Sequence, residues 1–353
     1  SRLARTFALG FGGLLVLAIG SELAVRAWIM TPSTAAYDPE LGLVHRPGSR
    51  FVNSAEGWSA SRANSFGRFD DEPRTPRATH LALLLGDSYA EALQVDRSEG
   101  FAQVAERSLP GLDVFNVAQS GRTPADHVRF AAAYVPRLLP DVLIVQVNDG
   151  DVPELLAPKP ADAVEAALFA GDAAAIERAT GPMAPMPDRL RRLFGRSALL
   201  RFARARSEAL LDKERERLGR KFAGAGHVAA PAAGEPDAIP PGADAAADRV
   251  CEALLATCPQ VVFVYIPAIE YFETPPRIES ETRREFWSAV AARHGIETVD
   301  PTDTLLAEYA RTREPLHGFQ NSLMGRGHLN APGHRLLGEQ LAWLSREPFR
   351  GRR

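Results

Sequence analysis

Cysteine is scarce in this chain, and motifs for metal or phosphate binding are missing. Only two cysteines, Cys251 and Cys258, occur among the 353 residues. No cysteine–histidine cluster has zinc-finger spacing and there is no glycine-rich phosphate loop, so the sequence predicts neither a metal nor an organic cofactor. The formal net charge of −3 gives no indication of a nucleic-acid partner.

The spacing of the two cysteines leaves their redox state open. Inside one helix, Cys251 and Cys258 would have Cα atoms about 10.5 Å apart, whereas a disulfide needs less than roughly 7 Å. Pro259 can end such a helix early and bring the two closer. A disulfide and two buried free thiols are therefore both compatible with the sequence.

The N-terminal segment is apolar enough to contact a membrane. Residues Phe7 to Gly20 carry no charge, and the apolar run continues to Met30, interrupted by Glu22 and Arg26, which can pair at their i, i+4 spacing. About 20 apolar residues span a bilayer, so a cleaved signal peptide is the alternative to an anchor. No small-x-small cleavage site directly follows the run, which favours an uncleaved transmembrane anchor over residues 1–30.

The orientation of this anchor follows from its flanking charges. Arg2 and Arg5 precede the apolar run and favour a cytoplasmic N-terminus. The remainder of the chain is then expected outside the cytoplasm, as a single-pass inner-membrane protein with a periplasmic catalytic domain if the source is a Gram-negative bacterium. A buried core helix is disfavoured because this segment has no polar face.

The chain beyond the anchor divides by composition. Hydrophobic residues make up 45% of the sequence, which is typical of a globular protein with a core. We expect a linker and irregular lead-in over 31–78, an α/β domain over 79–347 with an insertion at 152–246, and a basic tail at 348–353. Within the lead-in, short strands are expected near Leu43–His45 and Arg50–Val52.

Strand and helix patterns alternate along the α/β domain. Apolar runs predict buried strands, and amphipathic segments between them predict helices, an alternation typical of a doubly wound parallel sheet. The expected strands are Leu81–Leu85, Leu112–Val117, Asp141–Val147, Val261–Pro267 and Glu297–Val299. The expected helices are Phe101–Ser108, Pro124–Leu138, Asp248–Thr257, Ser280–His294, Leu305–Arg311 and His334–Leu344.

The insertion has two expected parts. Asp188–Phe222 predicts a basic helix, packed on the core with a solvated arginine face or, as the less favoured alternative, lying on a membrane surface. Ala223–Asp248 is low in complexity and predicts a flexible loop.

Polar residues follow three of the predicted strands. Residues 83–89 read Leu-Leu-Leu-Gly-Asp-Ser-Tyr and place Ser88 after the first strand, while Gly121 follows the second and Asn148 the third. Ligands of open α/β sheets bind outside the carboxyl ends of the strands. A serine nucleophile needs a base and donors for the developing oxyanion, and His328 lies before the last predicted helix.

In this order and at these positions, the motifs resemble the SGNH (GDSL) hydrolase family across residues 79–347. The resemblance implies a flavodoxin-like three-layer α/β/α fold with Ser88 as nucleophile and His328 as general base. It also implies an oxyanion hole formed by the backbone N–H groups of Ser88 and Gly121 and the side-chain amide of Asn148. The lead-in is similar to that of membrane-anchored bacterial members, and Tyr265–Pro267 to a strand end in members linked to exopolysaccharide acylation.

One family feature is missing. The aspartate usually found two or three residues before the base is replaced by Gly325 and Arg326. Three arrangements fit: a Ser–His dyad held by a backbone carbonyl, a substitute carboxylate such as Asp303 or Glu314, or a non-catalytic site. Loss of the orienting acid can cost about 10⁴-fold in rate in a triad built around it.

Other polar residues near the motifs receive structural interpretations. Asp87 is expected to point away from the nucleophile and stabilise its loop. His334 is expected to face the last helix, and His127 and His317 carry no motif.

The sequence therefore predicts a serine esterase or O-acyltransferase without a cofactor. The expected partners are an ester substrate, with a cell-envelope carbohydrate as its expected class, and the membrane through the N-terminal helix. The alternative is a non-catalytic module of the same fold that binds a glycan or a partner enzyme.

Overall fold

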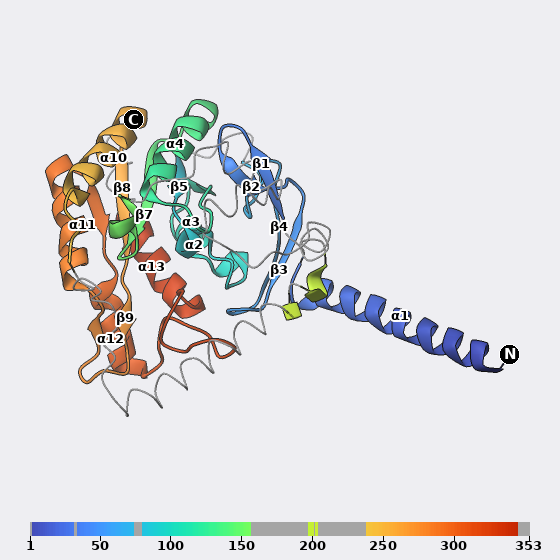
Figure 1. Cartoon of the computed structure of the whole chain (residues 1–353). Coiled ribbons are helices and arrows are strands. Elements are labelled where there is room, and N and C mark those ends of the chain that lie inside the picture. The colour runs from blue at the N-terminus through green and yellow to red at the C-terminus, as the bar shows by residue number, and fades with distance from the viewer. Residues whose placement is uncertain are drawn as a thin grey trace.

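The molecule is built around one parallel sheet, and a long N-terminal helix projects outward from the side of the molecule (Figure 1). The computed structural model describes residues 2–31, 34–73, 80–156, 197–200, 202–203 and 238–344. The expected insertion helix Asp188–Phe222 lies almost wholly outside these residues, as do most of the low-complexity segment and the basic tail.

The central sheet has five parallel strands. They are β5 (His80–Leu85), β6 (Leu112–Asn116), β7 (Val142–Asn148), β8 (Val261–Ile266) and β11 (Glu297–Val299). Their order across the sheet is β11-β8-β7-β5-β6. Read from β6 and numbered along the chain, this is 2-1-3-4-5, the flavodoxin-like doubly wound order. The predicted fold class is confirmed. The chain adds β6 on one side of β5 and the later strands on the other side, so the order of strands reverses between β5 and β7.

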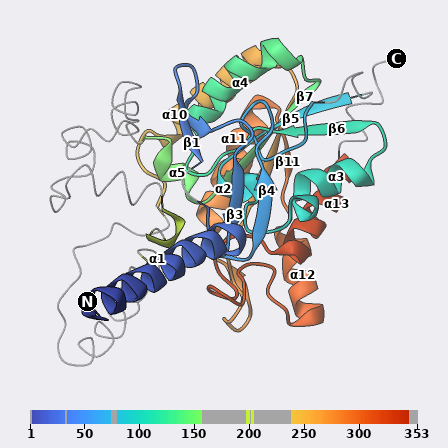
Figure 2. The ribbon, with the colours of Figure 1, turned by 90° about the vertical axis from the view of Figure 1, so that its right-hand side faces the viewer.

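Helices cover both faces of this sheet (Figures 1 and 2). Along β5, Leu81, Leu83 and Leu85 pack on one face and Ala82 and Leu84 on the other, as the two-residue period of a strand requires. The first face is covered by α4 (Pro124–Leu138), α10 (Ala243–Thr257) and α11 (Glu281–His294). The second is covered by α3 (Phe101–Ser108), α12 (Thr302–Thr312) and α13 (Ala331–Leu344).

Local sequence sets the ends of these helices. Thr123 and Asp126 form a capping box at the start of α4, with Pro124 at the first helical position. Ser280 caps α11 through a hydrogen bond from the Arg283 amide, and Gly295 ends it at φ +65°. These signals explain why the predicted bounds of the two helices agree closely with the structure.

The lead-in contains the two short strands expected near Leu43–His45 and Arg50–Val52, but within its described residues it is more regular than the sequence predicts. It forms two antiparallel hairpins, one from β1 (Ala35–Asp38) and β2 (Gly42–His45), the other from β3 (Arg50–Asn53) and β4 (Ser59–Arg62). Leu41 and Val44 of the first hairpin are buried in the core beside the sheet. Each strand is too short for its sequence to show the two-residue hydrophobic alternation of a strand. The two hairpins nevertheless cover apolar surface that the domain alone would expose.

A buried arginine fastens the lead-in to the domain. Arg68 is 1% exposed; its Nε donates to the Tyr134 hydroxyl at 3.0 Å and its Nη1 to Gln119 Oε1 at 2.8 Å. Its guanidinium also lies 4.6 Å from the centre of the Phe130 ring. Arg68 thereby joins the lead-in to helix α4 and to the loop after β6.

Helix α1 (Arg2–Trp28) leads into the first hairpin and is almost entirely exposed. Its residues Leu9–Trp28 are long and apolar enough to cross a membrane, a property that signal sequences share. Glu22 and Arg26 form the predicted pair, with Nε and Oε1 2.5 Å apart. Glu22 also accepts the backbone N–H groups of Ala198 and Leu199, so a piece of the insertion contacts this helix.

The remaining elements are short. They are α2 (Ser88–Glu91), the 3₁₀ helix η1 (Arg97–Glu99), α5 (Asp151–Glu154) and the hairpin of β9 (Ile269–Glu270) and β10 (Arg277–Ile278). Cys251 lies in α10 and Cys258 just after its end, and both are free and buried. The disulfide that the sequence allowed is therefore absent.

Replacing Arg68 with methionine should destabilise the protein. The Tyr134 hydroxyl and Gln119 would lose a buried partner, which costs roughly 2–3 kcal/mol in the free energy of unfolding. Urea denaturation of the detergent-solubilised chain would measure this. Arg62→Met, on the exposed face of β4, should change the free energy by less than about 0.5 kcal/mol. Equal stabilities of the two variants would contradict a fastening role for Arg68.

Candidate active site

Ser88 lies at the carboxyl end of β5, beside the point where the chain reverses across the sheet. It is the first residue of α2, and the Asp87 side chain caps this helix by accepting the Tyr89 amide at 2.8 Å. Gly86 makes the tight turn possible, because a Cβ there would lie 2.6 Å from the Ala90 side chain. The first amides of a helix have no partner within the helix, so the Ser88 N–H is placed to act as a donor.

The structure brings Ser88 and His328 into hydrogen-bond contact. His328 Nε2 lies 2.8 Å from Ser88 Oγ, although 240 residues separate them in sequence. The other ring nitrogen, Nδ1, lies 2.6 Å from Glu56 Oε2. Glu56 Oε1 also accepts the backbone N–H of His328 at 3.0 Å. A carboxylate that bonds Nδ1 fixes the tautomer in which Nε2 can accept the serine proton.

Glu56 is the substitute carboxylate, and the two residues suggested from sequence are not. Asp303 is exposed and lies 3.8 Å from Arg284, in the first turn of α11. The Glu314 amide bonds the Thr312 hydroxyl next to it in the chain. Glu56 instead comes from the loop between β3 and β4, in the segment expected to be irregular.

Two neighbouring residues hold the Glu56 loop against the domain. Asn321 accepts the Gly57 amide at 2.9 Å and donates to the carbonyls of Ser54 and Gly57 at 3.0 and 2.7 Å. Gly57 has φ +65°, and a Cβ there would lie 2.0 Å from the Gln94 carbonyl oxygen. The loop therefore fits closely between two other loops, which fixes the position of Glu56.

The charge state of Glu56 suits its contact with His328. Partial burial raises the pKa of Glu56, but the hydrogen bonds and the charge of His328 more than offset this, so the pKa lies below its usual value. Glu56 is therefore a carboxylate at neutral pH, able to stabilise an imidazolium.

The two expected oxyanion donors lie on either side of Ser88. Gly121 follows β6 in a left-handed conformation at φ +75°, and Asn148 ends β7, so the strands that carry them flank β5. The Asn148 amide nitrogen donates to Asp87 Oδ2 at 3.0 Å. An amide has two N–H donors, so this bond orients the Asn148 side chain and leaves the second N–H to bond an oxyanion.

A buried glutamate holds the loop that carries Gly121. Glu91 Oε2 accepts both the hydroxyl and the amide of Ser120, at 2.5 and 2.8 Å. Its Oε1 lies 2.8 Å from His45 Nε2. Burial raises the pKa of Glu91, but the bonds from His45 and Ser120 outweigh burial and lower it overall. No motif in the sequence marks Glu91, although its position in α2 makes it a neighbour of Ser88.

The other histidines near the motifs are buried away from Ser88. The His334 ring stacks on Phe101 with centroids 5.9 Å apart, and His317 Nδ1 lies 2.7 Å from the Tyr271 hydroxyl. Burial lowers the pKa of His127 to about 3. Within the described part of the chain, no group of three or more acidic, cysteine or histidine side chains could hold a metal ion.

Two pockets border the site. The polar pocket, about 690 Å³, lies beside β7 and β8, and its lining includes Tyr89, Asn148, Glu270, Arg277, Glu279 and Arg283. The lead-in pocket, about 370 Å³, lies on the β6 side and includes Gly121 in its lining. The Tyr89 ring also packs against the His328 ring, with centroids 4.7 Å apart.

Comparisons with known proteins give structural likeness only. The chain matches no family model and no curated protein. Similar solved structures include TesA, with 13% identity over 76% of this chain and 99% of TesA at a TM-score of 0.39. A lipolytic G-D-S-L family protein from Veillonella parvula is 10% identical over 76% of this chain and 98% of its own, at a TM-score of 0.40. The acetyl xylan esterase AlAXEase is 13% identical over 75% and 98%, at 0.40.

Replacing Glu56 with glutamine should slow the enzyme without weakening substrate binding. An amide can donate its proton to Nδ1 and favour the wrong tautomer of His328, so we expect kcat on an activated ester to fall about 10²- to 10⁴-fold with little change in KM. Glu339→Gln, on the exposed face of α13, is the matched control and should retain wild-type kcat. A kcat for Glu56→Gln within twofold of wild type would show that the carboxylate is dispensable.

Proposed function

We propose that this chain is a serine esterase of the SGNH type that forms an acyl-enzyme on Ser88. The observation that carries the proposal is the continuous hydrogen-bonded chain Glu56–His328–Ser88, with distances of 2.6 and 2.8 Å. The order of Ser88, Gly121, Asn148 and His328 along the chain supports the family assignment. Because Glu56 supplies a carboxylate, the residues at 325 and 326 no longer favour a non-catalytic module.

In the proposed first half-reaction, Ser88 Oγ attacks the carbonyl carbon of an ester while its proton passes to His328 Nε2. The carbonyl oxygen becomes an oxyanion that the N–H groups of Ser88, Gly121 and Asn148 stabilise. Glu56 stabilises the imidazolium. The bond to the alcohol oxygen then breaks, His328 returns the proton to that oxygen, and the acyl group stays on Ser88.

In the second half-reaction, a hydroxyl group takes the place of the departed alcohol. Water or a sugar hydroxyl gives its proton to His328 and attacks the acyl carbon, and Ser88 recovers its proton as it leaves. Hydrolysis and acyl transfer thus use the same groups, and the acceptor that binds decides between them.

The polar pocket supports a carbohydrate as the alcohol part of the ester. Its size lies within the range of small-molecule sites. Arg277 lies 3.3 Å from Glu270 and Arg283 bonds the Asp149 carbonyl at 3.2 Å, so charged donors and acceptors converge on it. Such groups suit an alcohol with several hydroxyls, and Tyr89 joins this pocket to His328, which must protonate the departing alcohol.

The N-terminal helix supports a membrane location for this site. In the proposed orientation α1 crosses the inner membrane and the α/β domain is periplasmic. Trp28 and Trp58 are both exposed, and the Trp58 indole N–H donates to the Trp28 carbonyl at 2.9 Å. Exposed tryptophans at the end of an apolar helix are typical of the membrane–water interface. A cell-envelope carbohydrate ester is accordingly the proposed substrate class.

The enzyme should lose its activity when Ser88 is replaced by alanine. The full chain in detergent should hydrolyse p-nitrophenyl acetate and react with a fluorophosphonate probe, and Ser88→Ala should lower the rate at least about 10³-fold and abolish labelling. Ser98→Ala, at an exposed position of η1, is the control. A wild-type rate equal to that of Ser88→Ala, with no labelling, would refute the esterase.

Arg277→Ala should impair the use of a carbohydrate ester selectively. A hydrogen bond to a charged group contributes about 1.5–3 kcal/mol, so we expect the ratio of kcat/KM for an acetylated oligosaccharide to that for p-nitrophenyl acetate to fall about tenfold or more. Arg335→Ala, exposed on α13, should leave the ratio unchanged. An unchanged ratio in Arg277→Ala would count against the polar pocket as the carbohydrate site.

A further inference from the structure

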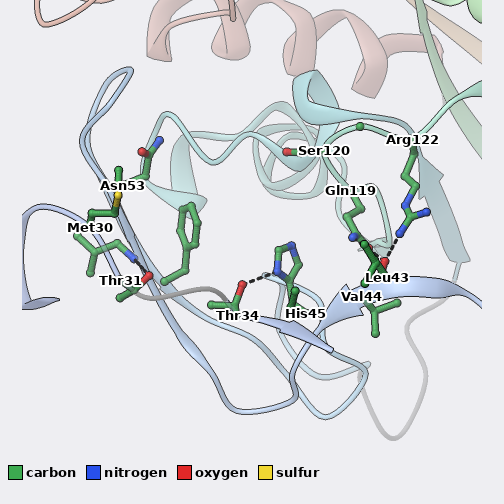
Figure 3. A pocket seen from close by; sticks show the side chains of 14 residues that line it. Met30, Thr31, Thr34, Leu43, Val44, His45, Asn53, Gln119, Ser120 and Arg122 are labelled. Carbon is green, nitrogen blue, oxygen red and sulfur yellow. Dashed lines mark hydrogen bonds between the residues drawn. The ribbon is translucent and has the colours of Figure 1, made fainter. Parts of the chain in front are cut away.

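The lead-in pocket is built largely from residues outside the α/β domain. Figure 3 shows Met30 and Thr31, which follow α1, facing a space that Leu43 and Val44 of β2 and Arg122 border from the other side. Strand β3 contributes Phe51, Val52 and Asn53, and the loop after β6 contributes Gln119 to Arg122. Two segments far apart in sequence therefore enclose one cavity.

Most of the polar side chains of this pocket already form hydrogen bonds with other groups of the protein. The Thr34 hydroxyl lies 2.7 Å from His45 Nδ1, and the second ring nitrogen of His45 is bonded to Glu91 (Figure 3). The Thr31 hydroxyl accepts the Val52 amide at 3.2 Å.

The polar side chains of the loop after β6 also form hydrogen bonds within the protein. Gln119 uses its amide nitrogen on the Leu43 carbonyl and its oxygen on Arg68. Arg122 donates to the same Leu43 carbonyl. Groups engaged in this way offer few hydrogen bonds to a guest, whereas the partly exposed side chains of Met30, Leu43 and Phe51 offer apolar surface.

The pocket also touches the expected oxyanion loop. Ser120 and Gly121 line it, and Glu91 ties Ser120 to the helix that begins at Ser88. In an ester, the carbonyl oxygen and the acyl chain are attached to the same carbon. A carbonyl oxygen bound at the Gly121 amide would therefore place its acyl chain at the mouth of this pocket.

We propose that the lead-in pocket binds the aliphatic chain of the acyl group, an assignment that rests on the proposed esterase. The polar pocket on the other side of Ser88 holds the charged groups and Tyr89, which packs on His328, so it suits the alcohol. The strand order places Gly121 and Asn148 on opposite sides of the nucleophile. The two parts of the ester thus occupy different pockets, and an acyl group longer than acetyl has a site of its own.

A chain-length series on variants of Ala35 tests this assignment. Ala35 lines the pocket from β1, where it is paired with His45, and larger side chains there would occupy the space. The measured quantity is the ratio of kcat/KM for p-nitrophenyl octanoate to that for p-nitrophenyl acetate, with the full chain in detergent. Each buried methylene contributes up to about a fourfold gain, so the wild-type ratio should exceed about tenfold.

Ala35→Ile and Ala35→Phe should lower this ratio in that order, and Ala35→Phe by about tenfold or more. The isoleucine variant suits a β-strand and still gives an answer if the phenylalanine variant does not fold. Ala310→Phe makes the same change at an exposed position of α12, outside this pocket, and should keep the wild-type ratio.

The outcomes separate the two proposals. If wild type hydrolyses acetate and is labelled at Ser88, but the ratio is the same in wild type and both Ala35 variants, the acyl pocket is refuted and the esterase stands. If wild type neither hydrolyses acetate nor is labelled, the esterase itself fails, and the acyl pocket fails with it.

Discussion

The contact between Glu56 and His328 is the interaction on which the rest of the site depends. It joins residues 272 positions apart, one in the β3–β4 hairpin and the other in the loop before α13. Neither loop has regular structure to fix its position, so the fit is made by Gly57 against Gln94 and by three hydrogen bonds of Asn321. The same contact lowers the pKa of Glu56 and orients the base, so packing and electrostatics are coupled here.

The sheet and the position of Ser88 were predictable because their signals are local. Strand β5 is a short apolar run that ends in glycine, and its alternating leucines need both faces covered whatever the rest of the chain does. Once the doubly wound order is set, the carboxyl ends of β5 and β7 meet at the reversal point. Ser88 and Asn148 therefore come together through topology, which the sequence pattern already determines.

The orienting acid was not predictable, because nothing local marks it. Glu56 lies in a short loop whose sequence has no hydrophobic periodicity. Its contact with His328 forms only after the two hairpins have packed on the domain. The positions where an acid was expected have other contacts: Gly325, at φ +81°, lies against the Phe272 ring, and Arg326 lies 3.5 Å from Glu270. In the loop that carries His328, positions 325 and 326 thus serve packing and a surface ion pair.

The hairpin that carries Glu56 is also the one fastened to helix α1. The Thr31 amide donates to the Val52 carbonyl at 3.2 Å, Arg50 donates to the Ala27 carbonyl at 2.9 Å, and Trp58 bonds Trp28. In the proposed orientation, the end of α1 marks the membrane surface. The Glu56 carboxylate is then held at a fixed height above that surface by a hairpin whose strand β3 also lines the lead-in pocket. Because one short hairpin does both, a shift of this hairpin relative to the α/β domain would separate Glu56 from His328 and would change the shape of the lead-in pocket at the same time.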